Sequence, residues 1–199
     1  MANDTTAGRP GDITAARSRT QQLATAALIA ALLAGTSWIN VRVGPVPFTL
    51  QTGFVILAAI LLSPGWAAAS VAVYVVLGAV GLPVFAGGTG GLGVLLGPTG
   101  GFLLAFPLAA AAGSAICRLV AGPEVSDAAR APWAAVAAAI VAEIVMYAIG
   151  LPWLAMQAHV GLGVAAGLAL VPFLVPDAVK AVAAIVVGSA VTRALRARR

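Results

Sequence analysis

Long apolar runs alternate with short stretches rich in glycine and proline along most of the chain. A helix that crosses a membrane needs about 20 mainly apolar residues, and somewhat fewer when its flanks adapt. Proline and glycine in SPGW, residues 63–66, predict a turn between the second and third runs. The pattern therefore predicts an all-α bundle of six transmembrane helices. The runs cover about residues 23–38, 49–62, 67–80, 101–120, 133–149 and 177–194.

Composition supports a membrane protein. The 199 residues are 61% hydrophobic and 9% charged, whereas soluble domains carry about 25% charged residues. Residues 1–22 are polar, contain Asp4 and Asp12, and lack the early apolar core of a signal peptide. We expect a disordered cytoplasmic tail over residues 1–22, a membrane domain over 23–194 and a basic cytoplasmic tail over 195–199. The predicted location is the cell membrane of a bacterium or archaeon.

The placement of the arginines predicts the orientation. They precede the first run, follow the last one, and include Arg130 in the internal loop 121–132. Six spans would put these three segments on one side, which the preference for positive charge inside makes cytoplasmic. Among the arginines, only Arg42 would lie outside. Basic residues at span ends are typical of membrane anchoring, so the net charge of +5 does not indicate nucleic-acid binding.

Three segments on the predicted outer side are apolar and interrupted by glycine and proline. They are residues 40–48, 81–101 and 151–176. Irregular backbone at membrane depth is tolerated where it is buried in protein or lines a cavity. The three segments together predict a pocket that opens to the outside.

Residues 81–101 contain nine glycines and no charge. A phosphate-binding loop of the Walker type needs a lysine, which this segment lacks. Two interpretations remain. The segment is either a close-packed turn or a loop that closes over a ligand, where missing side chains let the backbone approach.

Apart from Arg118 and Arg193 near the predicted cytoplasmic ends of their runs, the predicted spans contain three charged residues. Asp177 and Lys180 are three residues apart, so on a helix they share a face. Such groups are costly in a membrane and usually face a bundle interior or a functional cavity. The pair is either an ion pair that stabilises the helix start or a polar pair presented to a solute. Glu143 is either a hydrogen-bonding partner between helices or part of a proton-coupling path.

Small residues four apart in the first run predict close helix packing. Ala26 pairs with Ala30, and Ala27 with Ala31. These rows fit packing inside the bundle or contact with a partner helix. Tyr74, in the third run, fits packing or a position in the pocket wall.

The chain has few residues for catalysis. Its single cysteine, Cys117, and single histidine, His159, give too few partners for a metal site or a hydrolytic triad. We therefore expect no metal and no enzymatic activity. An intramembrane enzyme is the alternative from another functional class.

Four stretches together resemble BioY, the biotin-specific substrate-binding S component of energy-coupling factor (ECF) transporters. They are VGPVPFTLQT (43–52), the long block 74–106, YAIGLPWL (147–154) and VPFLVPDAVK (171–180). The resemblance covers about residues 23–192. It implies a six-helix S component that binds biotin at the outer face, without a covalent cofactor. It also implies a transmembrane coupling protein and two cytoplasmic ATPase subunits as partners, which would hydrolyse the ATP.

The resemblance also implies a binding site. The family's acidic residue and lysine fall on Asp177 and Lys180, which would meet ureido N–H groups and a carboxylate or nearby polar group of biotin. The family usually has Pro-Gly before this aspartate, where this chain has Val175 and Pro176. The other expected substrate-binding residues are Tyr74, Thr89, Gly87, Gly88, Phe85 and Gln51. The coupling protein would contact Ala26, Ala27, Ala30 and Ala31. An S component for another small vitamin is the nearest alternative.

Overall fold

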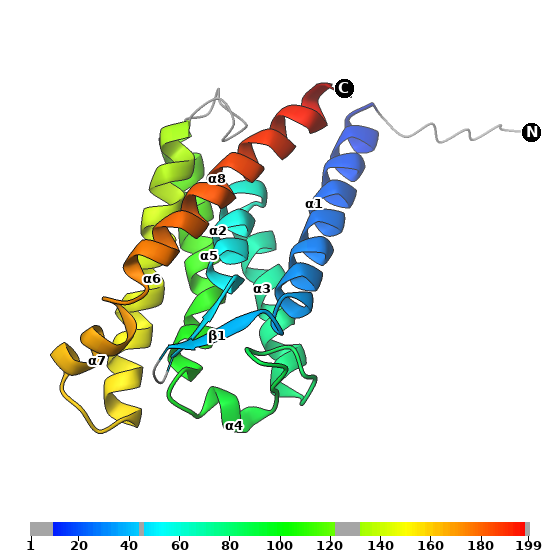
Figure 1. The fold of residues 1–199 in the computed structure, drawn as a ribbon. Coiled ribbons are helices and arrows are strands. Elements are labelled where there is room, and N and C mark those ends of the chain that lie inside the picture. The colour runs from blue at the N-terminus through cyan, green and yellow to red at the C-terminus, as the bar shows by residue number, and fades with distance from the viewer. Residues whose placement is uncertain (1–9, 44–45, 122–131, 198–199) are drawn as a thin grey trace, which may run out of the picture.

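The computed structural model describes residues 10–43, 46–121 and 132–197. Six helices of 11 or more residues form a bundle in this part of the chain (Figure 1). The start of α1 and the end of α8 lie at one end of the bundle, and the strands, α4 and α7 lie at the other, called here the hairpin end. The elements are α1 Pro10–Gly35, β1 Asn40–Val43, β2 Val46–Thr49, α2 Gln51–Leu61, α3 Pro64–Ala79, α4 Leu92–Leu95, α5 Gly100–Ala121, α6 Pro132–Gln157, α7 Leu162–Ala169 and α8 Leu174–Ala197.

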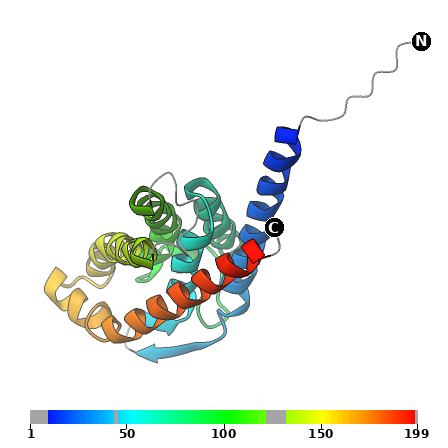
Figure 2. The ribbon, with the colours of Figure 1, turned by 90° about the horizontal axis from the view of Figure 1, so that it is seen from above.

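Helix α2 lies at the centre of the bundle, where α1, α3, α5, α6 and α8 all contact it (Figure 2). After Gln51 and Thr52 at its start, its sequence is apolar on every side, which is the composition of a buried helix. It ends at Leu61, and Pro64 begins α3 after a two-residue connection. Proline suits a helix start because its missing N–H would have no partner in the helix there. A turn is therefore present where the sequence predicted one, but it occupies residues 62–63, and residues 64–66 already belong to α3.

Glycines allow α5 and α6 to approach closely. A Cβ on Gly150 would overlap the ring of Phe102, and a Cβ on Gly101 would overlap the side chain of Trp153. The Trp153 indole N–H also donates a hydrogen bond of 2.9 Å to the carbonyl oxygen of Gly97. Two aromatic side chains thus fill the space that the two glycines leave open.

The outer surface of the bundle is apolar. Large hydrophobic side chains such as Val76, Leu108, Ile140 and Val182 are each more than half exposed. Patches of this extent are unusual on soluble monomers and suit a lipid-facing surface. Among the described residues, α5, α6 and residues 174–194 of α8 are long and apolar enough to span a membrane. Helices α2 and α3 are shorter and apolar.

The two alanine rows of α1 face different surroundings. Ala26 is buried, and its carbonyl oxygen accepts a 2.7 Å hydrogen bond from the Ser70 hydroxyl of α3. Ala30 is half-buried, whereas Ala27 and Ala31 are exposed. The first row therefore packs inside the bundle, and the second is available to another molecule.

The prediction of an all-α chain is wrong for residues 40–49. Strands β1 and β2 pair in antiparallel fashion, with Asn40 opposite Thr49 and Val43 opposite Val46. Valine and phenylalanine are common in strands, and this segment is too short to span the membrane as a helix. The hairpin ends directly at α2 and brings Thr49 to the start of that helix.

Helix boundaries also differ from the predictions. Helix α1 begins at Pro10, so residues 10–22 are helical rather than part of a disordered tail. Helix α8 begins at Leu174 and continues to Ala197, beyond the predicted membrane domain. Residues 1–9 and 198–199 of the predicted tails lie outside the described residues, as does Arg130.

Candidate ligand-binding pocket

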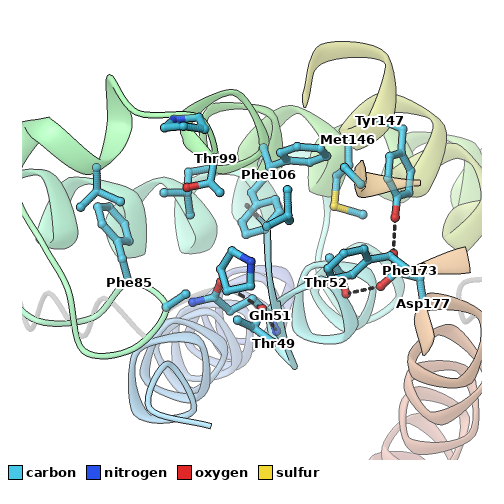
Figure 3. Close-up of a pocket in the computed structure, with 18 of the residues that line it drawn as sticks. Thr49, Gln51, Thr52, Phe85, Thr99, Phe106, Met146, Tyr147, Phe173 and Asp177 are labelled. Carbon is cyan, nitrogen blue, oxygen red and sulfur yellow. Dashed lines mark hydrogen bonds between the residues drawn. The ribbon is translucent and has the colours of Figure 1, made fainter. Parts of the chain in front are cut away.

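A cavity of about 360 Å³ lies where β2, the start of α2 and the glycine-rich segment meet helices α5 to α8 (Figure 3). Its size is at the lower end of the range for small-molecule sites, which are typically about 300–1,000 Å³. Its wall is mainly apolar and aromatic, with a few polar groups. The lining residues are Val46, Pro47, Thr49, Gln51, Thr52, Phe85, Ala86, Thr89, Val94, Pro98, Thr99, Phe102, Leu103, Phe106, Glu143, Met146, Tyr147, Ala169, Phe173, Asp177 and Lys180.

Asp177 is the centre of the main polar cluster. Its side chain is buried, and it forms an ion pair with Lys180 through Oδ1. The Thr52 hydroxyl donates a 3.2 Å hydrogen bond to the same oxygen, and the Tyr147 hydroxyl donates one of 2.5 Å to Oδ2. Figure 3 shows these two hydroxyl groups reaching Asp177 from different helices. The predicted shared face of Asp177 and Lys180 is confirmed, and α2 and α6 complete the cluster.

Lys180 connects this cluster to the hairpin. Its ammonium group donates a 3.0 Å hydrogen bond to the carbonyl oxygen of Thr49 and lies 4.7 Å from the ring centre of Phe48. The Phe48 ring in turn stacks on Phe173, with a centroid separation of 6.2 Å. An ammonium group has three N–H donors. Asp177 and Thr49 take two of them, and the third has no hydrogen-bond acceptor among the residues that the structure describes.

Gln51 and Tyr74 form a second polar contact. The Gln51 amide N–H donates a 2.6 Å hydrogen bond to the Tyr74 hydroxyl, and both side chains are buried. Tyr74 also meets the edge of Phe85 at a centroid distance of 5.7 Å. Gln51 and Phe85 line the pocket, whereas Tyr74 is not among the described lining residues. Tyr74 therefore lies behind the wall and supports both of them.

The glycine-rich segment folds on itself. Gly87 and Gly88 have positive φ angles of 75° and 70°, a conformation that glycine adopts without steric cost. Their N–H groups donate to the carbonyl oxygens of Ser37 and Phe85, at 2.8 and 2.9 Å. Both N–H groups therefore already have partners within the protein, and contact of Gly87 and Gly88 with a ligand stays a prediction. Thr89 does line the pocket, and its hydroxyl donates to a backbone carbonyl.

Glu143 lines the pocket from α6. Both carboxyl oxygens are buried, and neither has a hydrogen-bond partner among the described residues. The hydrogen bond between helices that we considered for Glu143 is therefore absent from the described structure. The described residues also contain no cluster of three histidine, cysteine, aspartate or glutamate side chains that could hold a metal ion.

Several lining residues were not predicted from the sequence. Tyr147 lies four residues after Glu143, so the two share a face of α6, and that spacing could have identified it. Thr52 follows Gln51 at the start of α2. Phe102 and Phe106 are also four residues apart and share a face of α5, but in a mainly apolar helix that spacing does not distinguish a pocket wall from ordinary core packing. Phe173 reaches the pocket from the segment before α8, and no spacing in the sequence indicated this.

Comparison with known proteins shows the family of this chain. The family model described as "BioY family" matches residues 9–197. The chain belongs to the BioY family. A probable biotin transporter BioY of Pyrococcus horikoshii is 38% identical over 172 residues, covering 85% of this chain and 94% of the relative. Biotin transporter BioY2 of Lactococcus lactis subsp. cremoris is 36% identical, covering 85% and 88%.

The fold of this BioY family member resembles a solved structure. The crystal structure of the S-component for biotin from an ECF-type ABC transporter aligns with a TM-score of 0.78 at 24% sequence identity. The alignment covers 89% of this chain and 93% of that one. The BioY family is a transporter family, and this chain is a multi-pass membrane protein.

Proposed function

We propose that this chain is the biotin-binding membrane subunit of a biotin uptake system in the plasma membrane. The observation that carries the proposal is the buried Asp177–Lys180 pair in the wall of an otherwise apolar pocket. Biotin combines an apolar bicyclic body with a ureido group and a carboxylate. The pocket offers aromatic walls for the body and a free Lys180 donor for an oxygen acceptor.

Six helices cross the membrane in this proposal, with both ends of the chain in the cytoplasm. Helices α1, α2, α3, α5, α6 and α8 are the six spans. The shared position of the described chain ends supports an even number of crossings (Figure 1). The arginines near those ends support the cytoplasmic side. The hairpin end and the pocket then face outward.

The substrate-binding residues in this proposal are those that reach the pocket: Asp177, Lys180, Gln51, Phe85 and Thr89. Tyr74 acts through Gln51 and Phe85. Gly87 and Gly88 shape the loop that carries Phe85 and Thr89. No covalent cofactor takes part.

Biotin binding is the first test of the function. We expect the detergent-purified full chain to bind biotin in isothermal titration calorimetry, and biotin to raise the midpoint of thermal unfolding, because a ligand that binds the folded state stabilises it. Lipoate, which has a carboxylate and a sulfur ring but no ureido group, serves as the control ligand. Failure of the protein to bind biotin, or equal binding of lipoate, would contradict the proposal.

The energy for uptake comes from partner subunits in this proposal. A transmembrane coupling protein contacts the exposed Ala27 and Ala31 row of α1, and two cytoplasmic ATPases hydrolyse ATP. Small side chains let two helices approach closely within a membrane. Ala26 and Ala30 hold α1 against its own bundle.

We expect the double variant Ala27→Leu/Ala31→Leu to lose most ATP-dependent biotin uptake, because the larger side chains keep the partner helix away. Biotin affinity of the purified subunit should stay unchanged, since both positions lie outside the pocket. Uptake of labelled biotin by cells and calorimetry on the purified chain measure the two effects. The control is Ile140→Leu, on an exposed face of α6. Wild-type uptake by the double variant would contradict this contact.

A further inference from the structure

The hydrogen-bonding groups that line the pocket are unevenly satisfied. Asp177 accepts from Thr52, Tyr147 and Lys180. Gln51 donates to Tyr74 and accepts from Thr49. Among the described lining residues, only Glu143 has buried side-chain oxygens without a partner.

The unpartnered carboxyl group of Glu143 is energetically costly. Buried polar atoms in folded proteins almost always have a hydrogen-bond partner, and an unsatisfied one costs stability. An ionised carboxylate is especially costly in a membrane interior. A chain that keeps Glu143 in a pocket wall therefore has a use for its oxygens that the ligand-free fold does not supply.

The position of Glu143 in the bundle limits which ligand groups can reach its carboxyl oxygens. Tyr147, which touches Asp177, lies one helical turn closer to the hairpin end on the same face of α6. Glu143 is therefore deeper in the bundle than the Asp177–Tyr147 contact. Met146, three residues after Glu143 on α6, and Phe106 on α5 are apolar members of the same pocket lining. A ligand group that reaches this depth needs a polar atom directed at the carboxyl group.

The hydrogen-bonding chemistry of a carboxyl group indicates which part of the ligand meets Glu143. A carboxyl oxygen repels another carboxylate but accepts a hydrogen bond from an N–H. Biotin carries two such donors on its ureido ring. We infer that Glu143 is a ligand-binding residue whose carboxyl oxygen accepts a hydrogen bond from a ureido N–H. This inference rests on the proposed function, and it leaves the free donor of Lys180 for an oxygen of the ligand.

The test compares two variants with the wild type. Glu143→Leu removes both acceptors at similar size, and Glu143→Gln keeps one oxygen but removes the charge. We expect Glu143→Leu to weaken biotin binding by about 10- to 100-fold in calorimetry, as for loss of a hydrogen bond to a charged or buried group. Ile144→Leu, the next residue on an exposed face of the helix, is the matched control and should bind as the wild type does.

A second ligand distinguishes direct contact from a structural role. In 2-iminobiotin the ureido ring is replaced by a guanidinium-like ring that is cationic near neutral pH. A carboxylate in contact with the ring should favour this cation, so Glu143→Gln should weaken 2-iminobiotin more than biotin. An indirect role would weaken both equally, and that result would overturn the inference.

Stability gives a further readout. Removing an unpartnered buried carboxyl group should leave the thermal midpoint of the ligand-free protein unchanged or higher, while the stabilisation by biotin becomes smaller. A lower ligand-free midpoint with unchanged biotin affinity would show that Glu143 is structural and overturn the inference. If the wild type itself binds no biotin, the proposed function fails instead. If Glu143→Leu does not fold, Glu143→Gln with the two ligands still decides the question.

Discussion

Biotin binding is expected to weaken about 30-fold or more when either Asp177 or Lys180 loses its charge. Truncating one member of a buried, hydrogen-bonded charge pair costs about 2–5 kcal/mol, much of it from the charge left unpaired. In Asp177→Asn, the Lys180 ammonium loses its counter-ion. In Lys180→Ala, the pocket also loses the donor that is free for the ligand. Calorimetry with biotin on the purified variants measures both effects.

A double variant separates binding from folding. Either single change leaves an uncompensated buried charge, so we expect it to lower the stability of the bundle by about 3–5 kcal/mol. Replacing both groups by apolar residues, as in Asp177→Leu/Lys180→Met, often restores stability because no charge remains buried. This double variant should unfold at a higher temperature than either single variant and still fail to bind biotin. Biotin affinity at the wild-type level in all three variants would mean that the pair only supports the helix start.

Tyr147→Phe is the graded control for this experiment. It removes one of the three donors to Asp177 and keeps the ion pair with Lys180. Its effect on biotin affinity should therefore be smaller than that of Asp177→Asn. An equal effect would mean that the hydroxyl itself, rather than the charge pair, determines binding.

The second large effect is expected at Gly150, where α6 meets α5. Gly150→Ala should destabilise the protein by about 1–3 kcal/mol, as inserted atoms do in a well-packed core. The new Cβ would overlap the Phe102 ring at its attachment side as well as its edge, so the ring must move as a whole. Phe102 lines the pocket and meets the Tyr147 ring edge-on. The variant should therefore also bind biotin more weakly.

Gly163→Ala is the matched control, because it lies in helix α7 and a Cβ there would have no atom within 4 Å. Alanine favours a helix over glycine by about 0.5–1 kcal/mol, so this variant should be as stable as the wild type or slightly more stable. Thermal unfolding with and without biotin compares the two variants. Equal stability of both would show that the contact between Gly150 and Phe102 relaxes without cost.

The glycine-rich segment shows where local sequence was ambiguous. Its composition fitted both a packed turn and a ligand-closing loop. In the structure, Gly87 and Gly88 supply backbone conformations, and their N–H groups bond within the protein. Their neighbours Phe85 and Thr89 reach the pocket. The distinction depended on φ angles and on hydrogen-bond partners distant in sequence, which glycine content does not specify.

The surroundings of Glu143 could not be predicted from the local sequence either. Its apolar surroundings in the sequence made it notable, and a hydrogen bond between helices was the simplest interpretation. In the described fold, its two carboxyl oxygens have no hydrogen-bond partner. Which residues face a given carboxyl group depends on how six helices are rotated against one another, and a single helix does not determine that rotation.

The sequence by itself determined the class of molecule, the helical runs and the shared face of Asp177 and Lys180. These follow from the apolar content and length of the runs and from the 3.6-residue period of one helix, which are local properties. Only the tertiary structure decided that residues 40–43 and 46–49 pair as antiparallel strands, and that Thr52 and Tyr147 complete the cluster around Asp177. It also separated the buried Ala26 from the exposed Ala27. The cluster around Asp177 and the burial of Ala26 depend on contacts between segments more than 20 residues apart in the sequence. Such contacts form because the helices bury whichever faces pack most closely together.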